Sequence, residues 1–119
     1  MIYLASPYTD RSRIVMRTRF KDACKAAGAF ARHNVRVYSP IAHSHPIAIA
    51  SSLPTSWQYW KGHSEEMLAM CDELWILMLD GWDKSRGVLA EIEIAVRLAL
   101  PIRYVSPADY SFVDEACHD

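Results

Sequence analysis

Short apolar runs alternate with longer amphipathic segments along the chain. The runs have the length and composition of buried strands, and we predict strands at residues 1–5, 35–39, 73–79 and 102–105. In the longer segments the apolar positions recur with helical spacing, which predicts helices at residues 10–33, 57–70 and 85–99. The proline-flanked stretch 40–46 is predicted to be irregular and to be followed by a helical turn at 47–50.

This order of strands and helices predicts one α/β domain over residues 1–119. Crossovers between parallel strands are right-handed and place helices on both faces of the sheet. We therefore expect a doubly wound, flavodoxin-like (Rossmann-like) parallel sheet of four or five strands in the order 2-1-3-4. In such a sheet, ligands bind at the carboxyl ends of the first and third strands. The loops at residues 6–9 and 80–83 follow those two strand ends.

The helix after the third strand carries a carboxylate near this expected site. Ser85 is a suitable N-cap, and Ser85 and Gly87 can offer a hydroxyl and backbone N–H groups to an anion. The apolar stripe of this helix consists of Val88, Ile92, Ala95, Val96 and Ala99. At roughly 100° per residue, Glu91 lies about 80° from the centre of the stripe and Glu93 about 120°. We expect Glu91 at the edge of the buried face, where a carboxylate can react, and Glu93 in water.

The helix at 57–70 precedes the third strand and must run antiparallel to it. Its first turns therefore reach the expected site, whereas Asp72 belongs to the opposite end of the strand. Several aromatic rings come close to the site, where they can stack on a planar base or serve as ordinary core packing: Tyr8, Trp57, Tyr59, Trp60 and Trp82. Glu65 and Glu66 lie at intermediate height along the helix, and Asp80 follows the strand.

Two histidines in the 40–46 loop allow three interpretations. His43 and His45 can contact a base or sugar, form hydrogen bonds within the loop, or join His63 in a metal site, for which the spacing is not diagnostic. Arg11 and Arg13 follow the first loop and are candidates to bind a phosphate. The cations further along that helix are interpreted as a solvated face: Arg17, Arg19, Lys21 and Lys25.

Composition narrows the class of ligand and the location of the protein. The 13 basic and 14 acidic residues give a formal net charge of −1, which argues against a nucleic acid polymer as partner and favours a small molecule. Cys24, Cys71 and Cys117 are widely spaced, so neither a disulfide framework nor a thiolate zinc site is expected. There is no basic leader and no apolar run of about 20 residues, so we expect a cytoplasmic protein without a membrane partner.

Several motifs carry a resemblance to a known superfamily. They are Ile2-Tyr3-Leu4-Ala5-Ser6, the apolar run of the third strand, and Ser85-x-Gly87-Val88-x-x-Glu91. Together they resemble the nucleoside 2-deoxyribosyltransferase superfamily, which includes the deoxynucleoside 5'-monophosphate N-glycosidases. The chain is especially similar to a small bacterial and phage branch that shares S-P-I-x-H-S-H-P-I, L-D-G-W-x-x-S-x-G-V and the following E-I-E. The likeness covers about residues 1–106.

The resemblance implies cleavage or transfer at the N-glycosidic bond of a nucleoside or nucleoside 5'-monophosphate, without a cofactor. It assigns the nucleophile to Glu91 and a supporting tyrosine to Tyr3. It also implies that Ser6 and Ser85 contact a 5'-phosphate, and that the protein is a homo-oligomer, a dimer or tetramer.

This chain departs from the superfamily pattern at two positions. An acidic residue of the superfamily aligns with Ser64, so the candidates for the acid that protonates the base are Glu65, Glu66, Asp80 and Asp83. Of these, we expect Glu65 or Glu66 to be the acid, because the helix geometry puts them on the side that approaches the site. Tyr8 stands where the superfamily has an arginine. Two alternative functions keep the same fold: an NAD glycohydrolase, and a non-catalytic nucleotide-binding module in which Glu91 hydrogen-bonds ribose hydroxyls.

Overall fold

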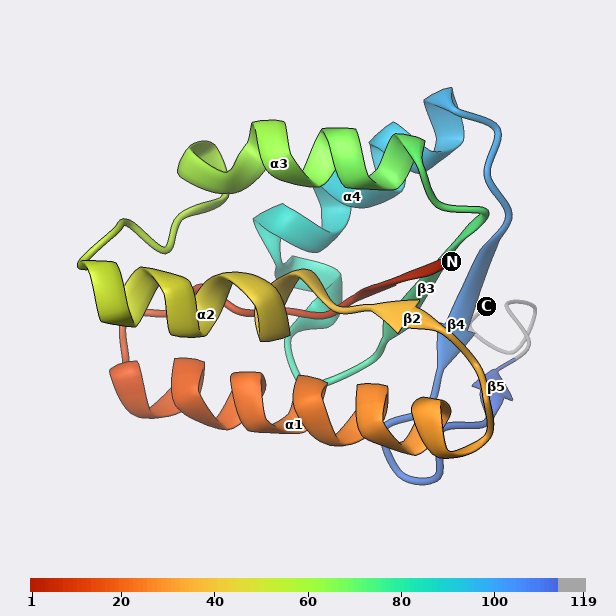
Figure 1. Cartoon of the computed structure of the whole chain (residues 1–119), viewed down its shortest axis with the longest axis horizontal. Coiled ribbons are helices and arrows are strands. Elements are labelled where there is room, and N and C mark those ends of the chain that lie inside the picture. The colour runs from red at the N-terminus through yellow and green to blue at the C-terminus, as the bar shows by residue number, and fades with distance from the viewer. Residues whose placement is uncertain (114–119) are drawn as a thin grey trace.

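The computed structural model describes residues 1–113 and has an α/β architecture with helices on both faces of one sheet (Figure 1). The strands are β1 (Ile2–Ala5), β2 (Val37–Tyr38), β3 (Glu73–Leu77), β4 (Ile102–Val105) and β5 (Phe112–Val113). The helices are α1 (Arg13–Arg32), α2 (Pro40–Ser51), α3 (Trp57–Ala69), the short 3-10 helix η1 (Trp82–Lys84) and α4 (Arg86–Arg97). The arrangement is compatible with a Rossmann-like fold.

The sheet has the order β2-β1-β3-β4-β5, so the expected order 2-1-3-4 was incomplete. The first four strands are parallel, and β5 pairs antiparallel with β4 at the edge. A turn makes this return possible, because Ser106 accepts from the backbone N–H of Tyr110 at 2.8 Å and Tyr110 has a φ of 60°. The Arg103 guanidinium lies 3.5 Å from the ring centre of Phe112. A strand of two residues has no apolar alternation that the sequence could have revealed.

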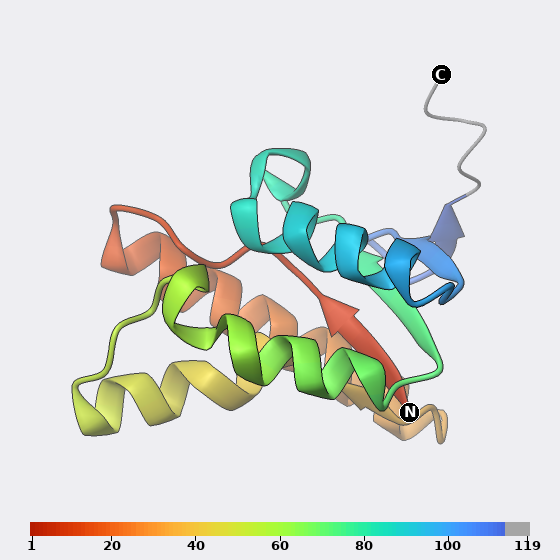
Figure 2. The same ribbon diagram turned by 90° about the horizontal axis from the view of Figure 1, so that it is seen from above.

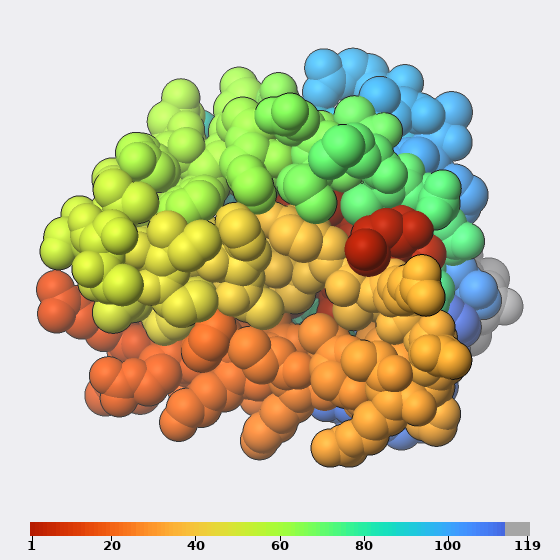
Figure 3. Space-filling view, in the orientation of Figure 1, coloured from red at the N-terminus to blue at the C-terminus, as the bar shows by residue number. Residues whose placement is uncertain are grey.

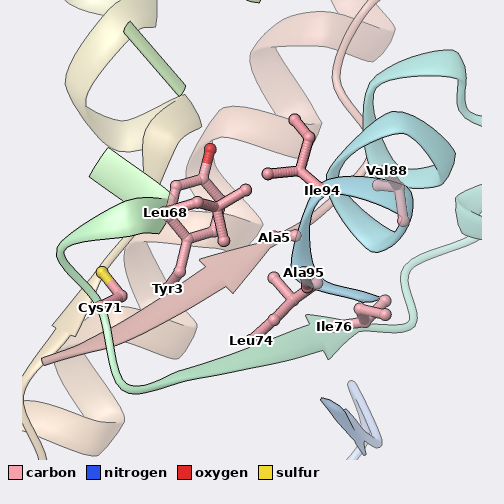
Figure 4. Close-up of a cluster of buried hydrophobic side chains, with 9 residues drawn as sticks. All are labelled: Tyr3, Ala5, Leu68, Cys71, Leu74, Ile76, Val88, Ile94 and Ala95. Carbon is pink, nitrogen blue, oxygen red and sulfur yellow. The ribbon is translucent and has the colours of Figure 1, made fainter. Parts of the chain in front are cut away.

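Side-chain alternation along β1 and β3 divides the core between the two faces of the sheet. On one face, shown in Figure 4, residues of the strands pack against residues of α3 and α4. This core consists of Tyr3, Ala5, Leu68, Cys71, Leu74, Ile76, Val88, Ile94 and Ala95. On the other face, α1 packs its Ala26 and Phe30 against strand residues of the sheet. The core there also contains Leu4, Trp75, Leu77 and Val105. Figure 2 shows α3 and α4 running beside each other, and Figure 1 shows α1 on the opposite side of the molecule. The chain is therefore wound on both faces, as the strand and helix order predicted.

Two helices differ from the sequence predictions by three or more residues. The first helix begins at Arg13 with Ser12 as its N-cap, because Asp10 instead accepts the backbone N–H of Ser12 at 2.8 Å. The second difference is α2, a full helix over residues that were predicted to be irregular. Ser39 caps this helix and Pro40 occupies its start, where proline is favoured. The prediction of an irregular stretch was therefore wrong, because Pro40 stands at a position where a helix accommodates proline.

The buried face of α4 is rotated relative to the predicted stripe. Val88, Ile94 and Ala95 are buried, whereas Val96 is 66% exposed. At roughly 100° per residue, Glu91 lies only about 20° from the mean direction of those three buried positions. The reason is that α4 packs against α3 as well as against the sheet. Glu91 is therefore at the centre of the buried face and 4% exposed, not at its edge, and Glu93 is exposed as predicted.

Within residues 1–113, no helix is both long and apolar enough to cross a membrane. Cys24 and Cys71 are free thiols. Cys117 lies outside the described residues.

Candidate active site

A cavity of about 580 Å³ lies at the carboxyl ends of β1 and β3. Its walls come from the loop after β1, the loop after β3 and the first turns of α2, α3 and α4. The helices α1, α2 and α3 make up much of the molecular face shown in Figure 3. The cavity therefore occupies the position between the first and third strands where the topology predicted a ligand site.

Glu91 lines this cavity as a buried carboxyl group. The hydroxyl of Tyr3 donates a hydrogen bond to its Oε2 atom. Burial raises the pKa of Glu91 to about 8, and the hydrogen bond from Tyr3 acts in the opposite direction. The side chain therefore exchanges a proton near neutral pH, which is the range in which catalytic groups operate.

Tyr3 in β1 is held in place by residues of β2, α3 and α4. Its side chain is fully buried, and its pKa is raised by burial and then by the charge of Glu91, while a hydrogen bond with Ser64 lowers it. The ring of Tyr38 packs against it at 5.5 Å between centroids. Tyr3 therefore keeps its proton and remains a hydrogen-bond donor to Glu91.

The start of α4 forms one end of the cavity. Ser85 caps the helix by accepting the backbone N–H of Val88 at 3.2 Å, as predicted. Nearby, Ser6 lines the cavity, and its Oγ atom is buried without a hydrogen-bond partner among the described residues. Lys84 and Arg86 line the same end. A helix start, two cations and an unpaired hydroxyl together provide an environment that favours an anion.

Arg19 connects the two loops that bound the cavity. Its guanidinium donates to the carbonyls of Tyr8 and Thr9 in the first loop and to that of Asp80 in the second, each at 3.3 Å. The second loop approaches closely at Gly81, whose φ is 89° and where an added Cβ would lie 2.9 Å from Arg19 Nη2. Arg19 was interpreted as part of a solvated face, but it lines the cavity and fixes its shape.

Aromatic rings line the cavity as well, and Trp57 lies beside the start of α4, where its Cε3 atom is 3.7 Å from the position of a Cβ at Gly87. Trp57 and Trp60, from the first turns of α3, line the cavity as predicted. The indole N–H of Trp60 donates to the carbonyl of Pro54 at 2.8 Å, which fixes the ring. Tyr8 lines the cavity as well, with its hydroxyl 2.6 Å from His45 Nδ1. The cavity wall thus combines aromatic rings, the cations Lys84 and Arg86, and the carboxyl group of Glu91.

Glu65 and Glu66 do not line the cavity. The residues of α3 that line it are Trp57, Gln58, Trp60, His63 and Ser64. At roughly 100° per residue, Glu65 points about 110° and Glu66 about 150° away from the mean direction of these five positions. The prediction placed them at the correct height along the helix but did not consider its rotation. Asp72 does lie at the far end, where its Oδ2 is 2.7 Å from the amino group of Met1.

Four other residues predicted to bind substrate contact the site indirectly or not at all. His43 stacks on His63 with ring centres 4.7 Å apart, and His45 contacts Tyr8 and stacks on Phe20. Asp80 contributes its carbonyl to Arg19, and Trp82 packs against Tyr104. None of the four lines the cavity. Within residues 1–113, no group of three or more His, Cys, Asp or Glu side chains is arranged to hold a metal ion.

A family model described as a domain of unknown function (DUF1937) matches residues 1–106. The chain belongs to this family. The match includes every residue that lines the cavity. No curated protein matches the chain.

In this DUF1937 chain, several cavity-lining residues were missed by the sequence analysis or named there without a binding role: Asp10, Arg19, Ser44, Thr55, Ser56, Gln58, Lys84 and Arg86. A signal existed for some of them. Lys84 and Arg86 flank the capping Ser85, and Ser56 caps the helix whose first turn was expected at the site. No comparable signal existed for Arg19, because only folding brings the loop after β3 beside α1.

Proposed function

We propose that this protein cleaves or transfers the N-glycosidic bond of a nucleoside or nucleoside 5'-monophosphate, with Glu91 as the nucleophile. The observation that carries the proposal is a buried carboxyl group in the cavity wall, hydrogen-bonded by Tyr3 and with a pKa raised to about 8. A structural glutamate seldom combines burial, a single phenol partner and contact with a cavity.

Two features of the cavity wall support a nucleotide as ligand. The indole rings of Trp57 and Trp60 offer surfaces on which a planar base can stack. The start of α4, with Lys84 and Arg86, suits a phosphate, and the unpaired Ser6 hydroxyl gives it a further donor. A ligand that binds through both its base and its phosphate would place its sugar in the cavity that Glu91 lines.

The reaction follows the chemistry of retaining glycosidases. The ionised carboxylate of Glu91 attacks C1' of the sugar, and the bond from C1' to the base nitrogen breaks. Water, or a second base, then displaces Glu91 from the glycosyl-enzyme. The hydroxyl of Tyr3 stabilises the ionised form of Glu91, because its hydrogen bond lowers the pKa of that carboxyl group.

A chromatographic screen for released base tests this function. Nucleosides, nucleoside 5'-monophosphates and NAD are incubated separately with wild-type protein and with Glu91→Gln. We expect base release from a nucleoside or its monophosphate, and loss of that release in Glu91→Gln. Glu93→Gln is the matched control, because Glu93 lies on the same helix and is exposed.

Three outcomes contradict the proposal. Glu91→Gln turning over within a few-fold of wild type would exclude Glu91 as nucleophile. Tight nucleotide binding without any base release would identify a binding module, and release of nicotinamide alone would identify an NAD glycohydrolase.

A further inference from the structure

Four rings from three elements form a cluster at the cavity wall. They are Tyr38 of β2, His43 of α2, and Trp60 and His63 of α3. The two imidazoles are parallel, with an interplanar angle of 3° and centres 4.7 Å apart. Trp60 stands at right angles to both of them. Of the four rings, Trp60 and His63 line the cavity itself.

His63 is tied to Tyr38 by one of its two ring nitrogens. Tyr38 Oη lies 2.9 Å from His63 Nε2, which leaves Nδ1 as the nitrogen able to exchange a proton with a ligand. Burial, and next the charge of Glu91, raises the pKa of Tyr38 to about 12, so the phenol keeps its own proton. Tyr38 therefore orients the imidazole and does not compete for its proton.

The imidazole that faces His63 belongs to His43 and favours its neutral form. His43 has its pKa lowered by burial and then by the charge of His63. Two parallel imidazolium rings at 4.7 Å would repel each other, so His43 serves as a neutral face for His63. Glu91 lines the same cavity from α4. An imidazole and a carboxyl group are thus available to one ligand.

We propose that His63 is the general acid that protonates the departing base, with Tyr38 as its positioning residue. This inference rests on the proposed N-glycosidic reaction. It replaces Glu65 and Glu66, which do not reach the cavity, with an imidazole that lines it together with Trp60, whose ring offers a surface for the base.

The proton and electron balance of the step is complete. As Glu91 forms its bond to C1', the electron pair of the breaking bond passes to the base nitrogen, and the Nδ1 proton of the His63 imidazolium moves to the base. The products are a neutral imidazole, a neutral base and the glycosyl ester of Glu91. When water displaces the ester, His63 accepts the proton of the water and Glu91 regains its charge.

The test compares two leaving groups in wild type and in His63→Gln. One substrate carries its natural base, and the other carries 4-nitrophenol, which leaves without a proton. We expect His63→Gln to lose about 10²–10⁴-fold in kcat on the natural base and less than about 3-fold on the nitrophenyl substrate. Tyr38→Phe should show a smaller loss with the same selectivity. His33→Gln, on an exposed histidine at the end of α1, is the control and should match wild type.

The outcomes separate this inference from the proposed function. If wild type is active and His63→Gln loses both substrates equally, or neither, then His63 is not the acid although the reaction stands. If wild type releases no base from any substrate, the reaction and the inference both fail. A second measurement uses the inactive Glu91→Gln protein, in which added adenine, guanine, cytosine, thymine or uracil should shift the ring resonances of His63 but not those of His33. No shift with any of these bases contradicts a base-facing His63.

Discussion

The hydroxyl of Tyr3 and the carboxyl group of Glu91 meet at the cavity although they are 88 residues apart in the chain. Tyr3 comes from the middle of β1 and Glu91 from the second turn of α4, so their contact joins the two elements that flank the ligand site. Tyr3 donates and Glu91 accepts, which stabilises the ionised form of a carboxyl group that burial otherwise disfavours. Because Glu91 changes its ionisation near pH 8, we expect both the activity and the stability of the protein to depend on pH.

We predict that activity rises with pH until Glu91 is ionised. With the nitrophenyl substrate, whose leaving group needs no acid, kcat/KM should increase about tenfold per pH unit below the pKa of Glu91 and level off above about pH 8. Tyr3→Phe removes the bond that lowers this pKa, so the inflection should move upward by roughly 1–2 pH units. A pH–rate profile of both proteins checks this, and an unchanged inflection in Tyr3→Phe would contradict it.

The raised pKa of Glu91 also predicts how stability depends on pH. The folded protein holds the Glu91 proton up to about pH 8, whereas a glutamate in the unfolded chain loses its proton near the ordinary pKa of 4.5. Between these values the folded state binds more protons, so the contribution of Glu91 to the free energy of unfolding falls as pH rises. Glu91→Gln removes this dependence and should be more stable than wild type at pH 8, on the order of a few kcal/mol. Urea unfolding at pH 5 and pH 8 measures the difference, which should be smaller at pH 5.

Ser6→Ala should separate ligand binding from stability. If the Ser6 hydroxyl binds a 5'-phosphate, its loss should raise KM for the monophosphate roughly tenfold and leave KM for the nucleoside nearly unchanged. Because Ser6 Oγ has no partner among the described residues, the variant should be as stable as wild type or more stable. Ser51→Ala, on an exposed serine at the end of α2, is the control. An equal increase in KM for both substrates would argue against phosphate binding.

Glu65→Gln and Glu66→Gln should each retain wild-type activity on natural bases. Neither side chain lines the cavity, and Glu66 is exposed. Base release under saturating substrate measures this. A selective loss on the natural base in either variant would mean that α3 is rotated in the active protein.

We also predict a homo-oligomer. Several large apolar side chains are exposed on the chain, among them Ile14 at 74%, Val96 at 66% and Ile49 at 65%. Light scattering at micromolar concentration should give a mass of two or more chains. A monomer across the concentration range would contradict the prediction.

Local patterns in the sequence predicted the elements that are regular and long. Helical spacing gave α3 and α4, the apolar runs gave β1, β3 and β4, and Ser85 was identified as a cap. Alternation of these elements was enough to predict the position of the cavity, between the first and third strands. The prediction failed where the pattern was short or ambiguous, at the proline-containing α2 and the two-residue β5.

The rotation of each helix about its own axis was decided by tertiary structure. Sequence periodicity places a stripe but cannot show how many neighbours bury it, so Glu91 was expected at an edge although packing against both α3 and the sheet makes it central. Rotation likewise turns His63 toward the cavity and Glu66 away from it. The identity of the candidate nucleophile was therefore present in the sequence, whereas its burial, its bond to Tyr3 and the groups that face the base depend on contacts between residues far apart in the chain.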